Sequence, residues 1–299
     1  MTEAYARTDL ATESCSAAGE GLRGVEQATQ RCAGCTVQRV RVISSEAAVV
    51  LGKPIGTYVT VDCGQIHRFD RERSREVSGV LAGELRRMTG LLTGRLPGIG
   101  LSVFVAGLGN AGLTADSVGP GTVDRLTATR HLKEHESELF SALGCSELSA
   151  FSPGVLGQTG IETLELLRGA VGSVRPNLAV VVDALAARSC SRLASTVQIS
   201  DSGIVPGSGV GNHRTAITSE TLGVPVIALG VPTVVNSATL VWDVLKEAHI
   251  GEVSDELRAV LENGKSFFVS PKESDLISEA VAQLLADAIS EAFIGEMPF

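Results

Sequence analysis

Two aspartates stand where strands of an α/β protein would end, and together they could catalyse hydrolysis. Asp183 directly follows the apolar run 178–182, and Asp116 comes soon after the run 101–106. Neighbouring parallel strands bring such positions to one edge of a sheet, where open α/β sheets bind ligands. Two close carboxyls resist simultaneous ionisation, so one keeps a proton while the other activates water. A simpler interpretation stays open, in which each aspartate only caps a following helix.

A glycine-rich turn, Gly107-Leu108-Gly109-Asn110, follows the first of these apolar runs. Gly107, Gly109 and Asn110 are candidate backbone and amide donors to the oxyanion of a hydrolysed carbonyl. The alternative is a tight turn in which Asn110 bonds its own backbone. The third glycine of the dinucleotide fingerprint is missing and no Gly-Lys-Ser/Thr loop follows, so nucleotide binding is not favoured.

Two further groups of residues could contact a substrate. The loop 203–212 is rich in glycine, and its residues Gly207, Gly209 and Gly211 are candidates for a substrate groove or lid; a plain surface loop is the alternative. Arg130 and Arg188 are the basic residues nearest the motifs and could hold an acidic side chain beside the bond to be cut. Each could instead form a salt bridge on a helix, and this interpretation is favoured for Arg130.

Cysteine and histidine patterns give weaker indications. Cys32 and Cys35 supply only two of the four ligands of a zinc site, and nothing around them predicts a redox motif. His131 and His135 have helical spacing, but their charged neighbours indicate a solvated face. His213 follows the glycine-rich loop and is not assigned as a metal ligand. No Gly-x-Ser-x-Gly elbow accompanies the histidines, so serine catalysis is not favoured.

The elements that must position these residues follow from hydrophobic patterning. The short apolar runs 101–106, 178–182 and 225–229 are rich in β-branched residues and separated by enough chain for helical crossovers. Strands are also predicted at 36–43 and 56–61, and helices at 70–92, 116–132, 160–174, 234–249 and 272–293. The sequence therefore predicts a three-layer α/β sandwich with a mostly parallel central sheet.

The chain is predicted to consist of a flexible N-terminal arm, residues 1–35, and one α/β domain, residues 36–299. The arm is small and polar with no apolar period. The chain has 299 residues, 25 Lys and Arg against 34 Asp and Glu, and 4% aromatic residues, so nucleic-acid binding is not favoured. It lacks a run of about 18 apolar residues and a signal-like N-terminus, which predicts a cytoplasmic protein without a membrane partner.

Several motifs, in order along the chain, resemble the spore germination proteases. They are Arg7–Ala11, Leu51–Tyr58, Gly107–Asn110, Thr129–Leu132, Ser152–Gly157, Asp183–Ala186, Pro206–Asn212 and Gly230–Val235. Each glycine-rich piece is weak by itself, but together they cover nearly the whole chain and are highly specific. The fold that this resemblance implies is similar to that of the hydrogenase-maturation endopeptidases, a phosphorylase/hydrolase-like fold.

The resemblance also implies an activity and a mode of regulation. It implies an endopeptidase that starts the degradation of small acid-soluble, DNA-protecting spore proteins at germination, in the forespore or spore core. The positions that match the family's essential aspartates are Asp116 and Asp183. The family trims its own N-terminus, and the matching bond joins Asp9 to Leu10, which makes residues 1 to about 9 a propeptide. A homotetramer without a cofactor or bound metal is implied as well.

Two other functions remain open on the sequence alone. A metal-dependent peptidase of the maturation type would share the Gly-x-Gly-Asn turn and the Asp-Ala pair, but it would need a histidine ligand. A non-catalytic binding protein of the same fold would not depend on Asp183. The first alternative predicts loss of activity on chelation, and the second predicts no effect of the substitution Asp183→Asn.

Overall fold

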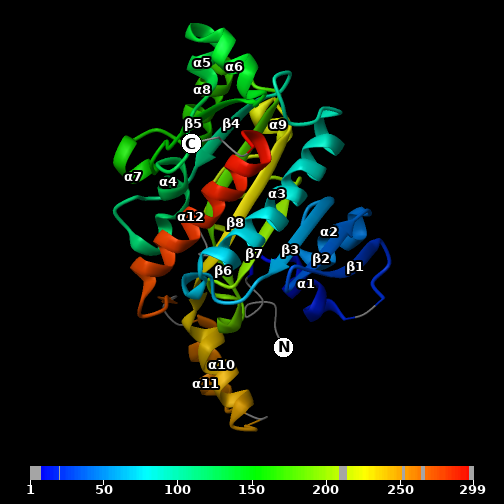
Figure 1. The fold of residues 1–299 in the computed structure, drawn as a ribbon. Coiled ribbons are helices and arrows are strands. Elements are labelled where there is room, and N and C mark those ends of the chain that lie inside the picture. The colour runs from blue at the N-terminus through cyan, green and yellow to red at the C-terminus, as the bar shows by residue number, and fades with distance from the viewer. Residues whose placement is uncertain (1–7, 20, 209–213, 251–252, 264–266, 296–299) are drawn as a thin grey trace.

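The computed structural model describes residues 8–19, 21–208, 214–250, 253–263 and 267–295. Within these ranges one sheet has the strand order β1-β2-β3-β7-β8-β6-β4-β5, and β9 pairs with β8 (Figure 1). The strands are β1 Val25–Cys32, β2 Cys35–Val42, β3 Gly56–Asp62, β4 Ser102–Gly107, β5 Glu147–Phe151, β6 Leu178–Ala187, β7 Thr196–Ser200, β8 Val226–Asn236 and β9 Phe268–Val269.

The sheet is parallel on one side and antiparallel on the other. Strands β5, β4, β6 and β8 run parallel, whereas β7, β3, β2 and β1 join them through antiparallel pairs. The α/β class and the parallel core predicted from the three apolar runs are confirmed. The prediction of a mostly parallel sheet needs correction, because the strands at 36–43 and 56–61 belong to an antiparallel half.

Helices cover both faces of the parallel half. The α-helices are α1 Ala11–Ala18, α2 Ser45–Leu51, α3 Arg71–Thr93, α4 Val118–Val123, α5 Arg130–His135, α6 Ser137–Leu143, α7 Leu156–Thr159, α8 Thr163–Val174, α9 Ser219–Leu222, α10 Ser237–Glu247, α11 Asp255–Asn263 and α12 Ser274–Phe293. Helices α3 and α12 lie side by side on one face. Helices α8 and α9 pack on the other face, so the parallel half has three layers.

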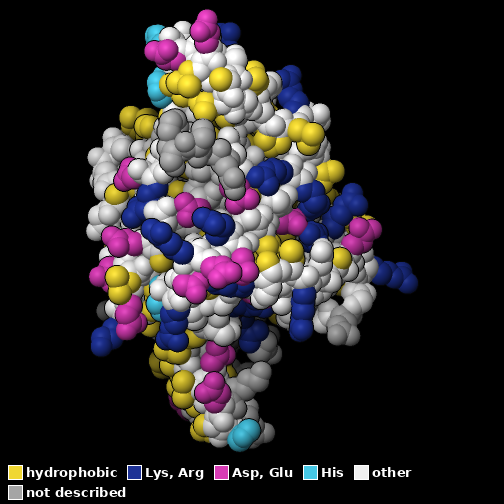
Figure 2. Space-filling model, in the orientation of Figure 1, with side chains coloured by type: hydrophobic (Ala, Val, Ile, Leu, Met, Phe, Trp, Pro, Cys, Tyr) yellow, Lys and Arg dark blue, Asp and Glu magenta, His cyan; other side chains and the backbone are white. Residues whose placement is uncertain are grey.

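The parallel half of the sheet has a hydrophobic core on each face, which explains why the central strands are apolar throughout. Successive side chains of a strand point to opposite faces, and each face here is covered by helices. In β4, Val103 and Val105 join the core under α3 and α12, while Phe104 and Ala106 join the core under α8. On the face seen in Figure 2, basic and acidic side chains alternate over α3 and α12, where Arg86 and Glu291 form an ion pair.

Some predicted boundaries were wrong. The helix predicted at 116–132 is divided into a 3-10 turn, Thr114–Asp116, and the separate helices α4 and α5. Strand β6 continues past Asp183, and β8 continues past Gly230, because the two strands stay paired to their ends. Asp183 is therefore a strand residue and not a helix cap.

The predicted N-terminal arm also needs correction within its described part. Residues 11–18 form α1, and residues 25–32 form β1, which pairs with β2 along its whole length. Cys32, Ala33, Gly34 and Cys35 make the tight turn between these strands, and Ala33 and Gly34 both have positive φ. Two-residue hairpin turns of type I′ require positive φ at both central residues, so the four residues build a turn.

Candidate active site

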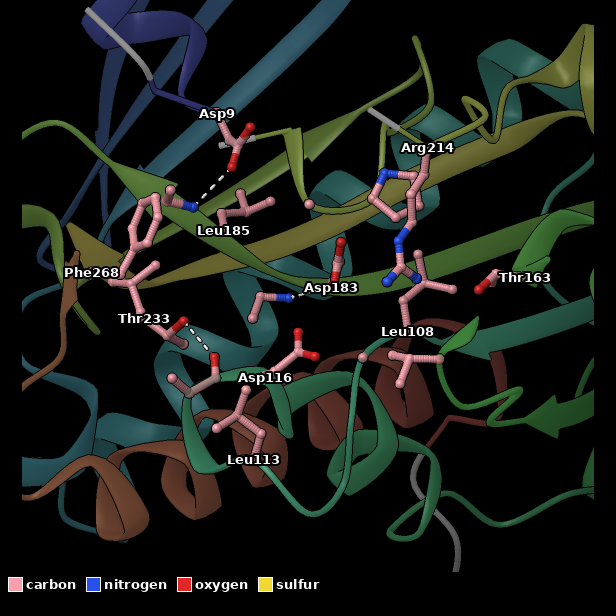
Figure 3. A pocket seen from close by; sticks show the side chains of 18 of the residues that line it. Asp9, Leu108, Leu113, Asp116, Thr163, Asp183, Leu185, Arg214, Thr233 and Phe268 are labelled. Atoms are coloured by element: carbon pink, nitrogen blue, oxygen red, sulfur yellow. Dashed lines mark hydrogen bonds between the residues drawn. The ribbon is translucent and has the colours of Figure 1, made fainter. Parts of the chain in front are cut away.

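The largest group of sequence candidates meets in one cavity at the carboxyl ends of β4, β6 and β8. The cavity has a volume of about 440 Å³, and its walls include Asp116, Asp183, Gly109 and Gly207. Figure 3 shows that Asp116 and Asp183 project into it from different segments, beside the guanidinium group of Arg214. The topology therefore brings together two aspartates that are 67 positions apart in the sequence, at the edge where α/β sheets bind ligands.

Strand β6 holds Asp183 in a buried position. The side chain is 5% exposed, and one carboxyl oxygen, Oδ1, accepts a hydrogen bond of 2.9 Å from the N–H of Ala184. Burial raises the pKa of Asp183 well above its usual value, and the negative charges of Asp116 and Asp9 raise it further. The neutral, protonated form of this carboxyl is thus the one that the site favours.

The turn after β4 holds Asp116. Its Oδ2 accepts a hydrogen bond of 2.8 Å from the N–H of Asn110, and the adjoining Ala115 carbonyl accepts one of 2.7 Å from the Thr233 hydroxyl on β8. Burial raises the pKa of Asp116, while the Asn110 N–H and the charge of Arg214 act in the opposite direction. Asp116 is therefore the carboxyl of the pair that ionises more easily.

The glycine-rich turn supports Asp116. Gly109 has a φ of +110°, and a Cβ atom there would lie 2.1 Å from the carbonyl oxygen of Asp116. The N–H of Asn110 is bonded to the Asp116 carboxyl, and the Asn110 side chain accepts from Gly112 and Gln158. In this structure the residues Gly107 to Asn110 thus make the tight turn that was the alternative interpretation, and their role as oxyanion donors stays a prediction.

The N-terminal segment lies in the same site. Asp9 lines the cavity, its N–H donates to the Ala186 carbonyl (2.9 Å), and its Oδ2 accepts from the Ala186 N–H (2.8 Å). Ser208 donates to the other carboxyl oxygen of Asp9 over 2.7 Å. The residue that the resemblance places before the self-cleavage bond is therefore docked against the end of β6, the strand that carries Asp183 (Figure 3).

Contacts of the residues around Asp9 also hold the N-terminal segment in place. Leu10 is fully buried and packs in a small apolar cluster with residues of β6 and β8. Glu13 accepts hydrogen bonds from the backbone of Arg188 (2.8 Å) and Ser189 (3.0 Å), and from the Thr8 hydroxyl. Lys53 donates to the Thr8 carbonyl over 2.8 Å. Burial lowers the pKa of Lys53, whereas the charges of Asp9 and Glu13 raise it.

The other predicted contact residues have different surroundings. Arg130 forms ion pairs with Glu134 and Glu147, as the salt-bridge interpretation predicted, and is not among the residues of the cavity wall. The backbone of Arg188 bonds Glu13, so this residue contributes to holding the N-terminal segment. Gly209, Gly211 and His213 lie outside the described residues.

Sequence reasoning missed three residues of the site. Arg214 is not part of any of the motifs, and it lies beside the aspartates because it lines the same cavity. Lys53 belongs to the motif Leu51–Tyr58, which gave no indication of a contact with the N-terminus. Gln198 of β7 bonds the backbone of Asp9 and Ala11, 187 positions from Ala11 in the chain, and no local pattern identifies such a contact.

Two other features are absent from the described residues. No three His, Cys, Asp or Glu side chains of these residues gather in a way that could hold a metal ion. Nor is any helix of this part of the chain long and apolar enough to cross a membrane.

Comparison with known proteins identifies the family. A family model described as germination protease matches residues 4–259. The germination protease of Clostridium acetobutylicum is 39% identical, over 96% of this chain and 94% of that protein. That of Caldanaerobacter subterraneus subsp. tengcongensis is 38% identical (96% and 93%), and that of Priestia megaterium 39% (95% and 80%).

One solved structure is also similar. The [NiFe] hydrogenase maturation protease HycI from Thermococcus kodakarensis KOD1 is 20% identical and matches 64% of this chain and 92% of that chain, with a TM-score of 0.35. The family model spans the positions of both aspartates and of the docked N-terminal residues, and the relative from Clostridium acetobutylicum covers 96% of this chain. The chain therefore belongs to the germination protease family and is a protease.

Proposed function

We propose that this protease is a self-processing, aspartate-dependent endopeptidase that starts the degradation of small acid-soluble, DNA-protecting spore proteins at germination. The substrate class follows from the family. The observation that supports the aspartate mechanism best is that Asp116 and Asp183 line one cavity and differ in how strongly the site favours their protonated forms. Both carboxyl groups point into this cavity, which has a volume of about 440 Å³.

The two carboxyls have complementary roles in this mechanism. Ionised Asp116 removes a proton from a water molecule as the water oxygen adds to the carbonyl carbon of the substrate. Protonated Asp183 then gives its proton to the amide nitrogen as the C–N bond breaks. Each carboxyl ends in the opposite protonation state, and a proton must return from Asp116 to Asp183 before the next cycle. Arg214 helps to keep Asp116 ionised, in agreement with its effect on the pKa of Asp116.

The docked N-terminal segment accounts for a zymogen. Asp9 occupies part of the cavity wall, so a substrate cannot use that space until the segment leaves. Hydrolysis of the Asp9–Leu10 bond would remove residues 1–9 and with them a negative charge that raises the pKa of Asp183. We propose this bond as the self-cleavage site. We also propose that the protein forms a homotetramer in the forespore. Light scattering of the purified protein measures the mass of the assembly and tests this proposal.

Digestion of a purified small acid-soluble spore protein tests the proposed activity. Wild type should cut the substrate, and Asp116→Asn and Asp183→Asn should each lose at least about 10²-fold in rate, since each removes one proton-transfer group. Asp124→Asn is the matched control, because Asp124 is exposed and not part of the cavity wall. Equal rates for Asp183→Asn and the control would overturn the catalytic role of Asp183, whereas a wild type that does not cut the substrate would overturn the proposed substrate class.

A further inference from the structure

The side-chain amide of Gln198 spans the peptide bond that we propose to be cut. Its Nε2 donates to the carbonyl oxygen of Asp9 over 2.8 Å, and its Oε1 accepts from the N–H of Ala11 over 2.8 Å. One planar group therefore holds the chain on both sides of the Asp9–Leu10 bond. The acceptor of the Nε2–H group is the carbonyl oxygen of Asp9. Negative charge develops on this oxygen when water adds to the carbonyl carbon.

The register of the sheet puts Gln198 in the same row as Asp183. Gln198 of β7 is paired with Gly230 of β8, and Gly230 is paired with Asp183 of β6. Directly paired residues project from the same face of a sheet, and two strand spacings separate them by about 9–10 Å. Gly230 has no side chain, and Leu185 fills the space above it. An extended peptide lying over this row can therefore be held by Gln198 on one side and face Asp183 on the other.

The burial of Gln198 indicates that its amide is built to bind a peptide backbone. The residue is 8% exposed, and the hydrogen bonds of its side chain go to the N-terminal segment. A buried donor without a partner costs free energy, so the Nε2 group requires a new acceptor when Asp9 has left with residues 1–9. A carbonyl of another extended chain satisfies the freed Nε2 donor.

We propose that Gln198 binds the carbonyl oxygen of the bond to be cut and stabilises its developing negative charge. It acts first on Asp9 of its own chain and then on the corresponding carbonyl of a substrate. This inference rests on the proposed cleavage of Asp9–Leu10. It replaces Asn110 in that role, because the N–H group of Asn110 is already bonded to Asp116.

Self-cleavage of the full-length chain tests the proposal, with the new Leu10 terminus measured over time by mass spectrometry. Gln198→Met has neither donor nor acceptor and should slow cleavage by about 10²–10³-fold, the usual loss of one oxyanion donor. Gln198→Glu keeps the shape: when protonated it donates and accepts like the amide, and when ionised it only accepts. Its rate relative to wild type should therefore recover as the pH falls below the pKa of the introduced carboxyl, which burial raises above the usual value of about 4.3. Gln27→Glu, on the exposed strand β1, is the matched control.

A second measurement separates chemistry from docking. Hydrogen exchange at the amide of Asp9, which donates to the Ala186 carbonyl and not to Gln198, reports the docked fraction of the segment in an Asp116→Asn background that prevents cleavage. Because Leu10 and Glu13 still anchor the segment, Gln198→Met should reduce this fraction far less than it reduces the rate. If the cleavage rate of Gln198→Met is unchanged, faster, or lowered only in proportion to the docked fraction, the role of Gln198 is overturned and the cleavage proposal still stands. A wild type that never yields the Leu10 terminus would overturn the cleavage proposal and this assignment with it.

Discussion

Replacing Leu10 by alanine should release the N-terminal segment from the site. The Leu10 side chain is fully buried, and it packs against Leu185, Leu193 and Val235. Leu→Ala in a core costs about 2–5 kcal/mol, and a loss of about 3 kcal/mol raises the undocked population about 10²-fold. The polar contacts of Glu13 remain, so we expect local release of the segment and not unfolding of the whole chain.

Amide hydrogen exchange measures this release directly. In the Asp116→Asn background, Leu10→Ala should accelerate exchange at the Asp9 and Ala11 amides about 10²-fold and leave the central residues of β6 unchanged. Leu96→Ala is the matched control, because it is the same substitution at a side chain that is 78% exposed. Equal exchange at the N-terminal amides in the two variants would refute the reasoning that Leu10 anchors the segment.

Three further predictions follow from the site. Burial raises the pKa of Asp183, so the folded state binds a proton that the unfolded state has lost, and stability falls as pH rises above about 4. Asp183→Asn should therefore gain thermal stability over wild type at pH 8 more than at pH 4, whereas equal differences at both pH values would contradict the raised pKa. Gly109→Ala should destabilise the protein, because the new Cβ atom would meet the carbonyl oxygen of Asp116. Gly83→Ala is the control: a Cβ atom there meets nothing, and the substitution should stabilise α3 by about 0.5–1 kcal/mol. Denaturant titration measures the free energy of unfolding of both variants. Prolonged chelation should leave cleavage of a spore protein unchanged, and loss of activity restored by added metal would favour the metal-dependent alternative.

Local patterning predicted the parts of the fold that depend on local burial. The apolar runs at 101–106, 178–182 and 225–229 became β4, β6 and β8 because strands covered on both faces must be apolar throughout. The same reasoning placed Asp116 and Asp183 after neighbouring strands; the structure has Asp183 inside β6, just beyond the end of the adjacent β4, and Asp116 in the 3-10 turn that follows β4. The prediction of a shared cavity needed only strand direction and adjacency.

The sequence by itself thus determined the α/β class, the aspartate pair and, through its motifs, the family. Tertiary structure alone decided how the N-terminus lies in the site, because its contacts join residues far apart in the chain, such as Gln198 and Ala11. It also decided that β6 runs on past Asp183 and that Arg214 reaches the cavity. Periodicity reports whether a residue is buried, but the partner that buries it depends on the register and order of strands, which no short segment encodes.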